Sequence, residues 1–542
     1  MHYPAQADKI PPCQCGCPNG NDVRGWLAVV AQRHKTGQDK ETALRFAWER
    51  LAQMNPFPAT MGRICPHPCE SACSRGDKDG PVAIQTLERF LGDWAVNAGL
   101  SLPKEPGTLE REWVGVIGGG PAGLSFAYQM ARRGYRVTIY ERSARLGGML
   151  FHGIPEFRLP ERILGAEIGR IVDLGVEVRL ETCVGVDVSL AELRERHAAI
   201  FVGIGAQRGR GLGVPGEDGP GVLAGTAFLA AVNRGEAPPI GTRVVVVGGG
   251  NTAMDAARAA RRLGAAVTVL YRRSREEMPA IGEEVDEAVA EGVDLLLLAA
   301  PTRLVRDGVA LVSVEVQRMG LGEPDASGRR RPVPIHGQTL HIPADSVIAA
   351  VSQEPDWIHL DGIRPDGVWV NGEPDAEITS DVWAGGDARG LGIAGMAIAQ
   401  GRQAAEAVHR RLRGIDCVDP PEHRDKVVAG NVKPQFYIDR LRVVPPISSV
   451  AERLAEPERE TVGTIDEEQF LAEVDRCMSC GLCFGCQHCW TYCNGSGFTR
   501  IVEPGPGNYF ALALDRCEQC GECVDICPCG YLSSRLDARP FA

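Results

Sequence analysis

The sequence predicts the α/β fold class, with two Rossmann-like domains between a cysteine-containing N-terminal segment and a small, cysteine-rich C-terminal domain. Two observations support this prediction. A strand, a glycine-rich turn and a helix occur twice, starting near Val114 and near Arg243. All but two of the 19 cysteines lie in the first 73 or the last 66 residues. A chain of 542 residues, 44% hydrophobic and 24% charged, is typical of a globular protein with three or four domains.

The first unit reads VGVIGGGPAG from Val114 to Gly123, a buried strand that runs into Gly118, Gly120 and Gly123. A helical stretch follows to about residue 134, and a second strand ends at Glu141. The glycines let the backbone approach a pyrophosphate, the helix N-terminus offers unpaired N–H groups, and the acid accepts hydrogen bonds from ribose hydroxyls. This unit therefore predicts a dinucleotide site.

The second unit reads TRVVVVGGGNTAMD and supplies Gly248, Gly250 and Ala253. Its second strand ends in Tyr271, Arg272 and Arg273, and no acid follows. A carboxylate would repel a ribose 2′-phosphate, whereas Arg272, Arg273 and Arg275 can pair with one. The unit therefore favours NADP(H) over NAD(H), with solvent-facing arginines as the alternative.

A third signal lies at 379–387, where TSDVWAGGD precedes a helical stretch at 394–411. A strand that ends in Gly-Gly-Asp before a helix predicts that Asp387 and the helix N-terminus lie near another phosphate or ribityl group.

The C-terminal cysteines form two runs with the spacing CxxCxxCxxxC. This spacing is typical of [4Fe-4S] ferredoxins, in which the last cysteine of each run ligates the cluster of the other run. One predicted cluster is held by Cys483, Cys486, Cys489 and Cys527. The other is held by Cys517, Cys520, Cys523 and Cys493. A disulfide framework or zinc ribbons would also use cysteines, but a zinc site uses two CxxC pairs separated by a longer loop.

Charge and composition exclude other classes of function. The net charge of −12 argues against a nucleic-acid partner, which requires a basic surface. No apolar stretch has the length of a membrane span, and MHYPAQADKIPP does not read as a secretion signal. We therefore expect a cytoplasmic protein, in which cysteines stay reduced and bind cofactors.

These motifs, in this order, resemble the glutamate synthase small (beta) subunit and its relatives, which include the NADPH half of dihydropyrimidine dehydrogenase. The resemblance covers nearly the whole chain. Its carriers are GRICPHPCESAC at 62–73, GPVAIQTLERF at 80–90, VIGGGPAGL at 116–124, LGGML at 146–150, GIPEFRLP at 153–160, VVVVGGGNTAMDAAR at 244–258, YRRSREEMPA at 271–280 and AGGD at 384–387.

The resemblance implies FAD at the first unit and NADP (or NAD) at the second, so that hydride passes from nicotinamide to flavin. The implied FAD residues are Gly118, Gly120, Pro121, Ala122, Gly123, Glu141, Arg142, Gly148, Met149, Gly386, Asp387, Gly395, Met396 and Ala397. The implied NAD(P) residues are Gly248, Gly250, Asn251, Thr252, Ala253, Arg272 and Arg273. We expect Cys183, the only cysteine of these domains, to be a buried structural thiol.

The resemblance also sets the expected domains. They are an α-helical [4Fe-4S] domain at 1–105, an FAD-binding domain at 106–215 and 346–415, an NAD(P)-binding domain at 216–345, a linker at 416–470 that is extended or lies on the surface, and a ferredoxin-type domain with two [4Fe-4S] clusters at 471–542.

Matching the family's N-terminal motifs implies one [4Fe-4S] cluster on Cys17, Cys65, Cys69 and Glu88. A carboxylate ligand is unusual, and Glu88 as a plain surface residue is the alternative. For a second N-terminal cluster, Cys13 and Cys73 are present, but the family's preceding CxxC pair is missing. Our hypothesis is that Cys477 and Cys480 fold back to complete it. The alternatives are spare thiols or a ligand role for Cys15, and neither Cys529 nor Cys417 receives a role.

We expect an NAD(P)H:acceptor oxidoreductase, an electron-transfer subunit that uses no catalytic side chain and works with a separate redox subunit in a hetero-oligomer. The resemblance suggests a 2-oxoacid:ferredoxin oxidoreductase or a siroheme sulfite reductase as that partner. The small subunit of a glutamate synthase is the alternative function. A scaffold whose clusters only hold the fold together is a third.

Overall fold

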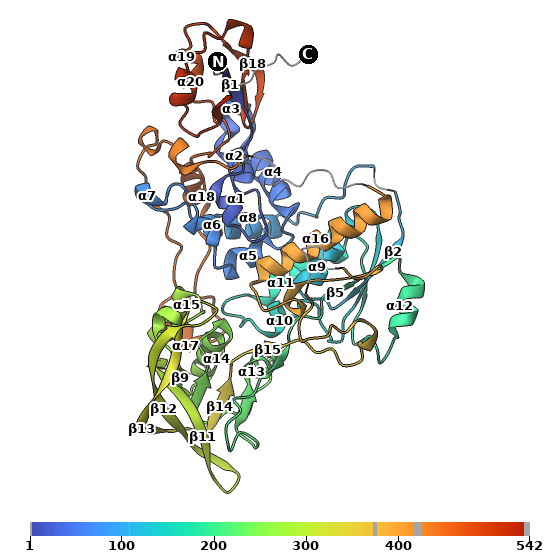
Figure 1. Cartoon of the computed structure of the whole chain (residues 1–542), viewed down its shortest axis with the longest axis vertical. Coiled ribbons are helices and arrows are strands. Elements are labelled where there is room, and N and C mark those ends of the chain that lie inside the picture. Colours follow the sequence, from blue (N-terminus) through green and yellow to red (C-terminus); the bar gives the residue numbers. More distant parts are fainter. Residues whose placement is uncertain (1–2, 108, 372–376, 416–424, 536–542) are drawn as a thin grey trace.

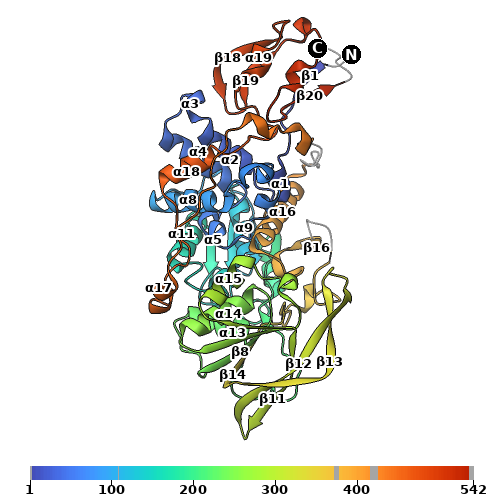
Figure 2. The same cartoon turned by 90° about the vertical axis from the view of Figure 1, so that its left-hand side faces the viewer.

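The computed structural model describes residues 3–107, 109–371, 377–415 and 425–535. This part of the chain is elongated (Figure 1): a small cysteine-rich module lies at one end, a helical domain lies next to it, and two sheet domains follow. The view in Figure 2 shows the same order along the long axis. None of the described helices has the length and apolar character that crossing a bilayer requires.

The N-terminal part of the chain is the expected helical domain. The side chains of Asp22 and Asp39 accept hydrogen bonds from the N–H groups of Gly25 and Thr42 and so cap α2 and α4. The later helix α18 (Glu467–Val474) packs on α2 and α8, so the chain returns to this domain before its last module. The helices are α1 (Pro12–Gly16), α2 (Val23–Ala31), α3 (Arg33–Thr36), α4 (Lys40–Ala52), α5 (Pro58–Ile64), α6 (Pro68–Ser71), α7 (Gly76–Asp79) and α8 (Ile84–Asn97).

The first Rossmann-like domain has a six-stranded sheet in the order β16-β17-β5-β2-β3-β4. All of its neighbouring strands are parallel except β16 and β17. The predicted strand, glycine turn, helix and strand are confirmed as β2, α9 and β3. The strands are β2 (Trp113–Ile117), β3 (Arg136–Tyr140), β4 (Glu177–Arg179), β5 (Ala199–Val202), β16 (Glu377–Thr379) and β17 (Val382–Ala384). The helices are α9 (Pro121–Ala131), α10 (Met149–His152), α11 (Glu161–Val172), α12 (Leu190–Arg196) and α16 (Ala394–Arg413).

The second Rossmann-like domain has a parallel sheet in the order β10-β9-β8-β14-β7. Helices pack on one face of this sheet, and the antiparallel sheet β11-β12-β13 packs on the other. Its elements are β7 (Val222–Ala224), α13 (Gly225–Asn233), β8 (Arg243–Val247), α14 (Asn251–Arg262), β9 (Ala266–Tyr271), α15 (Gly282–Ala290), β10 (Asp294–Leu297), β11 (Ala299–Asp307), β12 (Ala310–Pro324), β13 (Arg330–Pro343) and β14 (Ser346–Ala349).

The predicted domain boundary after residue 345 needs correction. Strand β14 lies between β8 and β7, so the second domain extends through Ala349. Its backbone bonds to both neighbours make it an interior strand of that sheet. The chain enters and leaves the domain through two short strands that pair with each other, β6 (Arg208–Gly209) and β15 (Gln353–Glu354).

The cysteine-rich module is closed by the other end of the chain. Strand β1 (Tyr3–Gln6) pairs antiparallel with β20 (Leu532–Arg535), with Tyr3 opposite Arg535. The first described residues are therefore part of the C-terminal module. Its other elements are α19 (His488–Thr491), β18 (Phe498–Gly505), β19 (Asn508–Leu512) and α20 (Glu522–Asp525).

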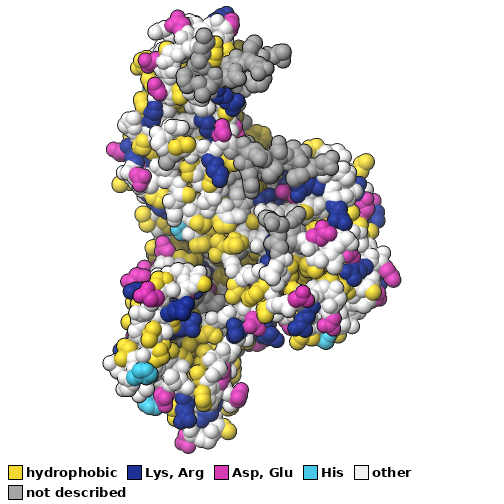
Figure 3. Space-filling view, in the orientation of Figure 1, with side chains coloured by type: hydrophobic (Ala, Val, Ile, Leu, Met, Phe, Trp, Pro, Cys, Tyr) yellow, Lys and Arg dark blue, Asp and Glu magenta, His cyan; other side chains and the backbone are white. Residues whose placement is uncertain are grey.

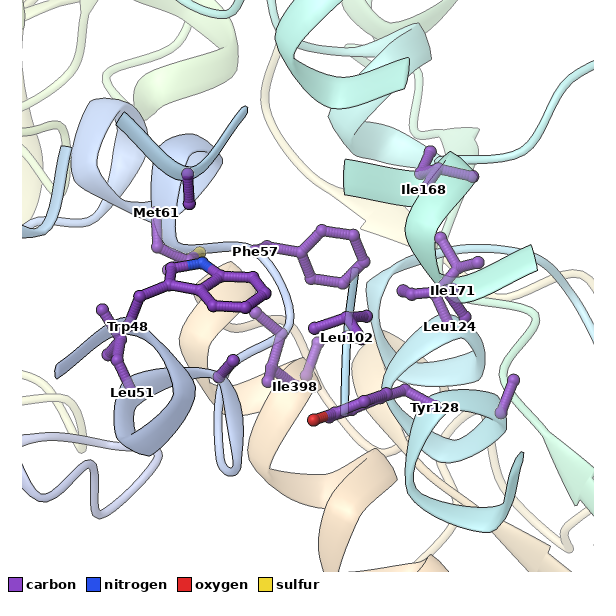
Figure 4. Packing of buried hydrophobic residues seen from close by; sticks show 14 of the residues in the cluster. Trp48, Leu51, Phe57, Met61, Leu102, Leu124, Tyr128, Ile168, Ile171 and Ile398 are labelled. Carbon is purple, nitrogen blue, oxygen red and sulfur yellow. The ribbon is translucent and has the colours of Figure 1, made fainter. Parts of the chain in front are cut away.

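One hydrophobic core runs through the helical domain and the first Rossmann-like domain. Figure 4 shows Trp48 and Phe57 of the helical domain packed near Tyr128 of α9 and Ile398 of α16. All four are almost fully buried. Burying a large apolar side chain contributes about 2 kcal/mol, so contacts of this kind hold the two domains together as one unit.

Part of the predicted linker connects the helical domain to the second Rossmann-like domain through buried contacts, which its polar composition did not indicate. Its first part, residues 416–424 with Cys417, lies outside the described residues. Residues 446–464, which we call the strap, run from the helical domain to α17 (Val450–Ala455) beside α15 and back (Figure 1). In the strap, Arg453 is 3% exposed and Glu460 pairs with both Arg63 and Arg89 at 2.8 Å. Buried arginines of the helical domain thus pair with the strap, and the strap's own Arg453 pairs with Glu287 of the second Rossmann-like domain.

Acid should destabilise the fold through His197, which is 7% exposed and lies 3.1 Å from the hydroxyl of Tyr140 through its Nε2. Burial lowers the pKa of His197 to about 4 from its usual 6.5. The unfolded chain therefore takes up a proton near pH 6.5, but the folded chain does so only near pH 4. Stability from this group is fully present above pH 6.5 and is lost as the pH falls towards 4, by at most about 3 kcal/mol.

Urea unfolding at pH 7 and pH 5 checks this expectation. The unfolding midpoint of the native sequence should fall between these pH values, and it should fall less in a His197→Gln variant. An equal fall in both proteins would show that other groups cause the acid sensitivity.

Candidate redox sites

A cavity of about 350 Å³ lies at the carboxyl edge of the first sheet. It is lined by the loops that follow β2, β3, β4, β5 and β17. The carboxyl ends of parallel strands are the usual place for a ligand in such a sheet, and the volume is in the range of ligand sites. The predicted residues that line it are Gly118, Gly120, Pro121, Ala122, Glu141, Arg142, Gly148, Met149, Gly386, Asp387 and Ala397.

The glycine turn has no room for side chains. Gly118 has a φ of +99°, and a Cβ there would lie 2.5 Å from the carbonyl oxygen of Gly203. A Cβ on Gly123 would lie 2.0 Å from the carbonyl oxygen of Gly118. Pro121 then begins α9 at a position where no N–H is needed. The turn therefore brings the N-terminus of α9 to the cavity, where it can bind a pyrophosphate.

Two predicted carboxyl groups line this cavity, those of Glu141 and Asp387. The Glu141 carboxylate accepts hydrogen bonds from the N–H groups of Gly119 at 2.7 Å and Ser143 at 2.8 Å, which fix its orientation. Asp387 accepts from Gly392 N–H at 3.1 Å, and burial raises the pKa of Asp387 to about 6. A buried carboxyl group of this kind favours a hydroxyl-bearing ligand, which can donate hydrogen bonds to it. Both side chains therefore fit the ribose and ribityl groups of FAD.

Three predicted residues do not line the cavity: Gly123 packs under the turn, Gly395 lies next to Met61, and Met396 is 43% exposed. Cys183 is not the buried thiol we expected, because it is half-buried and lines the cavity. The sequence analysis missed a further group of lining residues. They are Thr182, Val184, Gly203, Ile204, Gly205, Gln207, Asp356 and Leu360. The first five follow β4 and β5, so the carboxyl-edge rule applied to every strand would have indicated them.

The second unit has the predicted local structure. Gly248 and Gly250 join β8 to α14, and Ala253 packs against Gly248. Asn251 accepts a hydrogen bond from Ile281 N–H, and Thr252 accepts one from Gln353. The N-terminus of α14 is therefore held towards the strand pair that enters the domain.

The predicted role of Arg273 in phosphate binding is wrong. Its side chain is 5% exposed, pairs with Asp325 at 2.5 Å and donates to the Arg330 carbonyl at 2.7 Å. Successive residues at a strand end point to opposite sides, which turns Arg273 inward and leaves Arg272 exposed. Arg275 is exposed and pairs with Asp286. The prediction of a contact with a 2′-phosphate therefore stays with Arg272.

A buried ion pair joins the two Rossmann-like domains. Arg158, in the loop before α11, contacts both carboxylate oxygens of Asp255 on α14 at 2.8 Å and Glu284 at 2.8 Å. The side chains of Arg158 and Asp255 are 6% and 4% exposed. In Figure 3 the surface is hollowed between the second domain and the rest of the molecule, and hydrophobic side chains gather there.

The first cysteine group is formed where two helices touch. A Cβ on Gly62 of α5 would lie 2.3 Å from Arg89 N, and one on Gly92 of α8 would lie 2.2 Å from Ala59 N. This contact brings Cys65, at the end of α5, close to Glu88 on α8. The four predicted ligands are near enough to raise one another's pKa values.

Glu88 is half-buried and accepts a hydrogen bond from Asn55 at 2.7 Å, so it is not a plain surface residue. Burial raises the pKa of Glu88 to about 8, and burial with the Glu88 charge raises that of Cys65 to about 12. Such groups ionise most readily beside a cation, which fits iron ligation.

The ferredoxin-type runs surround two cavities. Cys483, Cys486, Cys489 and Cys527 line one, together with Cys529, whose sulfur is 3.9 Å from that of Cys527. Cys493, Cys517, Cys520 and Cys523 line the other, and Cys520 is exposed. The last cysteine of each run thus lies with the other run, as the ferredoxin spacing predicts. Among the described residues, no group of three metal-ligating side chains is placed to hold a single ion.

A fourth cavity contains Cys13, Cys73, Cys477 and Cys480. The structure therefore brings together the residues of our hypothesis for the second N-terminal cluster. Cys15 is exposed and does not line this cavity.

A family model described as pyridine nucleotide-disulphide oxidoreductase matches residues 113–401, more than half of the chain. The chain belongs to the pyridine nucleotide-disulphide oxidoreductase family. A second model, dihydropyrimidine dehydrogenase domain II with a 4Fe-4S cluster, matches residues 7–100. The protein is therefore an NAD(P)H oxidoreductase with an N-terminal iron–sulfur domain, and FAD, NADP and [4Fe-4S] clusters are its cofactors.

Relatives confirm the resemblance to the glutamate synthase small subunit. The NADP(+)-dependent formate dehydrogenase subunit beta of Moorella thermoacetica is 38% identical over 86% of this chain and 70% of its own length. The NADPH-Fe(3+) oxidoreductase subunit beta of Geobacter sulfurreducens is 41% identical over 64% of this chain and 51% of its own length. The glutamate synthase [NADPH] small chain of Azospirillum brasilense is 35% identical over 74% and 86%. This chain thus spans about half the length of the Geobacter sulfurreducens relative.

A solved structure shows the same fold. Mycobacterium tuberculosis FprA in complex with NADPH has a TM-score of 0.50 and 17% identity to this family member, and the match covers 68% of this chain and all of that one.

Proposed function

We propose that this chain is the electron-transfer subunit of a hetero-oligomeric enzyme. It exchanges electrons between NADP(H) and a separate catalytic subunit through FAD and [4Fe-4S] clusters. One observation carries this proposal: a single folded chain contains a dinucleotide cavity and four groups of cysteines. Three of these groups line cavities of their own. FAD, when bound, supplies the chemistry that converts a hydride into two single electrons.

A short path joins the flavin cavity to the first cysteine group. Met61 on α5 lies 3.6 Å from the position of a Cβ on Gly395, in the first turn of α16, which also carries Ala397 into the cavity wall. The carbonyl of Met61 accepts a hydrogen bond from Cys65 N–H at 3.0 Å. This contact supports electron transfer between the two sites. The protein's residues bind and orient, and none has to act as an acid or base.

The names of the relatives favour a separate partner subunit. Two are beta subunits and one is a small chain. The exposed Cys520 places the last cysteine group of the C-terminal module at the surface, where a redox subunit can exchange single electrons with it. A 2-oxoacid:ferredoxin oxidoreductase or a siroheme sulfite reductase fits this one-electron chemistry.

The small subunit of a glutamate synthase is a second candidate, and the match with the Azospirillum brasilense small chain favours it. The two additional cysteine cavities of the C-terminal module favour the first candidate. Addition of NADPH to the purified chain without oxygen should first bleach the flavin absorbance and then the cluster absorbance. Unchanged clusters would support a scaffold role, and a large amidotransferase that co-purifies with the native chain would support the glutamate synthase function.

Arg272 should select NADP(H) over NAD(H). An Arg272→Ala variant loses one charge-assisted contact to the 2′-phosphate, so its KM for NADPH should rise about tenfold while that for NADH stays unchanged. Arg275→Ala is the matched control, because Arg275 is also exposed but pairs with Asp286. The concentration dependence of flavin reduction by NADPH and by NADH is measured by stopped flow for the native sequence and for both variants. Equal changes with both nucleotides would contradict the assignment of Arg272.

A further inference from the structure

The cavity formed by Cys13, Cys73, Cys477 and Cys480, which we call the composite site, takes two cysteines from each end of the chain. We propose that it binds a [4Fe-4S] cluster and that this cluster is the electrical connection between the N-terminal cysteine group and the C-terminal module. The direction of electron flow through this cluster rests on the proposed function. The choice of its four ligands rests on the contacts around the cysteines.

A turn that recurs at the cysteine sites supports iron–sulfur binding at the composite site. In this turn, the residue two positions after a cysteine has a positive φ. Its backbone N–H donates a hydrogen bond to the sulfur of that cysteine at 3.4–3.5 Å. Ser479 makes this bond to Cys477 in the composite site. The pairs in the other three groups are His67 and Cys65, Gly485 and Cys483, and Gln519 and Cys517. Three of these four residues are not glycine, so the turn is strained in the same way at independent places.

The charge around the composite site also fits a cluster. Arg24 lines the cavity, is 4% exposed, and donates to the Cys480 carbonyl at 2.9 Å. Its Nε is buried and has no hydrogen-bond partner among the described residues. A cluster bound by four thiolates carries net negative charge, which a buried guanidinium stabilises. The same guanidinium also pairs with the half-exposed Asp8 at 2.7 Å, so a cluster would add a second negative partner to a cation that already has one.

The spacing of the cysteines places the composite site in the middle of a line of four groups. Cys13 lies in α1 and Cys17 caps its C-terminus, and the four helical residue steps between them correspond to a rise of only about 6 Å. Cys480 and Cys483 belong to neighbouring cavities and are three residues apart, so their Cα atoms lie within about 11 Å. A hydrogen bond of 2.6 Å from Gly481 N–H to the Cys529 carbonyl also connects the two cavities. Each group is therefore close to the next.

Buried arginines hold the two halves of the composite site together. Arg476, directly before Cys477, is fully buried and donates to carbonyls of Pro81 and Gly80 and to the Asp79 carboxylate. Arg75, near Cys73, donates to the Arg476 carbonyl at 2.6 Å. These buried contacts therefore fix the position of Cys477 relative to Cys73.

The electrons balance in single steps. One hydride from NADPH brings two electrons, and the proton left after flavin oxidation goes to solvent. Two successive one-electron passages through the composite site carry both electrons to the C-terminal module. There a one-electron acceptor of the ferredoxin type, or the partner's redox centre, takes them up.

The test is a Cys477→Ser, Cys480→Ser double variant of the full chain, with Cys73→Ser as a variant from the other end and Cys15→Ser as the control. Iron analysis should show the loss of about four irons per chain in both test variants and no loss in the control. After rapid mixing with NADPH, flavin absorbance should fall in all proteins. In the test variants the electron paramagnetic resonance signals of the C-terminal clusters should stay absent, although dithionite produces them.

Iron content equal to that of the native sequence in either test variant would overturn the composite site. Loss of iron from Cys15→Ser alone would assign the ligand role to Cys15 instead. Normal NADPH reduction of the C-terminal clusters in the test variants would overturn the connecting role. If NADPH fails to reduce the flavin of the native sequence, the proposed function fails, but the iron analysis still decides the ligand set.

Discussion

A Gly118→Ala variant should be purified with its iron but with about tenfold less flavin. The new Cβ would lie 2.5 Å from the Gly203 carbonyl oxygen, and the residue has a φ of +99°. The turn must then move away from β5, which shifts the N-terminus of α9 from the pyrophosphate position. Strain of about 1–2 kcal/mol together with the displaced N–H groups accounts for a change of this size. The cysteine groups lie in other parts of the chain and should keep their clusters.

Gly175→Ala is the matched control for this variant. Gly175 has nearly the same φ, +96°, but no atom lies within 4 Å of its Cβ position. It should therefore show the backbone strain without the collision and keep its flavin. The ratio of flavin to iron in each purified protein is the measurement. Equal ratios in the two variants would mean that backbone strain alone, and not the close approach to Gly203, governs binding.

The second large effect is expected at the ion pair between the Rossmann-like domains. In an Arg158→Ala variant, the buried Asp255 carboxylate loses its ion-pair partner, while Glu284 keeps its pair with Arg258. Removing one member of a buried pair costs about 3–5 kcal/mol, because the remaining charge is left uncompensated. The nicotinamide and flavin domains should then no longer be held together, and the rate of flavin reduction by NADPH should fall sharply.

Arg145→Ala provides the comparison. Arg145 precedes the same loop and pairs with Glu161, but both side chains are 54% exposed, so its loss should cost less than about 1 kcal/mol. Urea unfolding and stopped-flow flavin reduction are measured on both variants. A small effect of Arg158→Ala on both measurements would mean that the packing between the domains, and not the ion pair, fixes their arrangement.

Local sequence patterns predicted the elements of the two Rossmann-like domains well. A strand followed by closely spaced glycines and a helix has few alternatives, because only glycine fits a turn such as that at Gly118. The first cavity was predicted from the loops after β2, β3 and β17 for the same reason. The loops after β4 and β5 carry no motif, so only the strand order reveals that they face the ligand.

Contacts over long sequence distances were harder to predict. The direction of the Arg273 side chain depends on Asp325, 52 residues away. The strap's charged composition is typical of a surface segment. Its buried pairs, those of Glu460 and Arg453, form with residues of distant domains and so leave no local pattern. The composite site was suggested only by a CxxC pair that was missing at one end and left over at the other. Its assembly depends on Arg75 and Arg476, which no local pattern distinguishes.

A reductive titration with NADPH under anaerobic conditions tests the central claim most directly, that a two-electron donor site feeds a line of one-electron centres. A chain that holds one FAD and four [4Fe-4S] clusters accepts six electrons, so uptake should continue well past one equivalent of NADPH and approach about three. Visible absorbance and electron paramagnetic resonance follow the flavin and the clusters separately. Uptake that stops at about one equivalent, with a reduced flavin and oxidised clusters, would contradict the account.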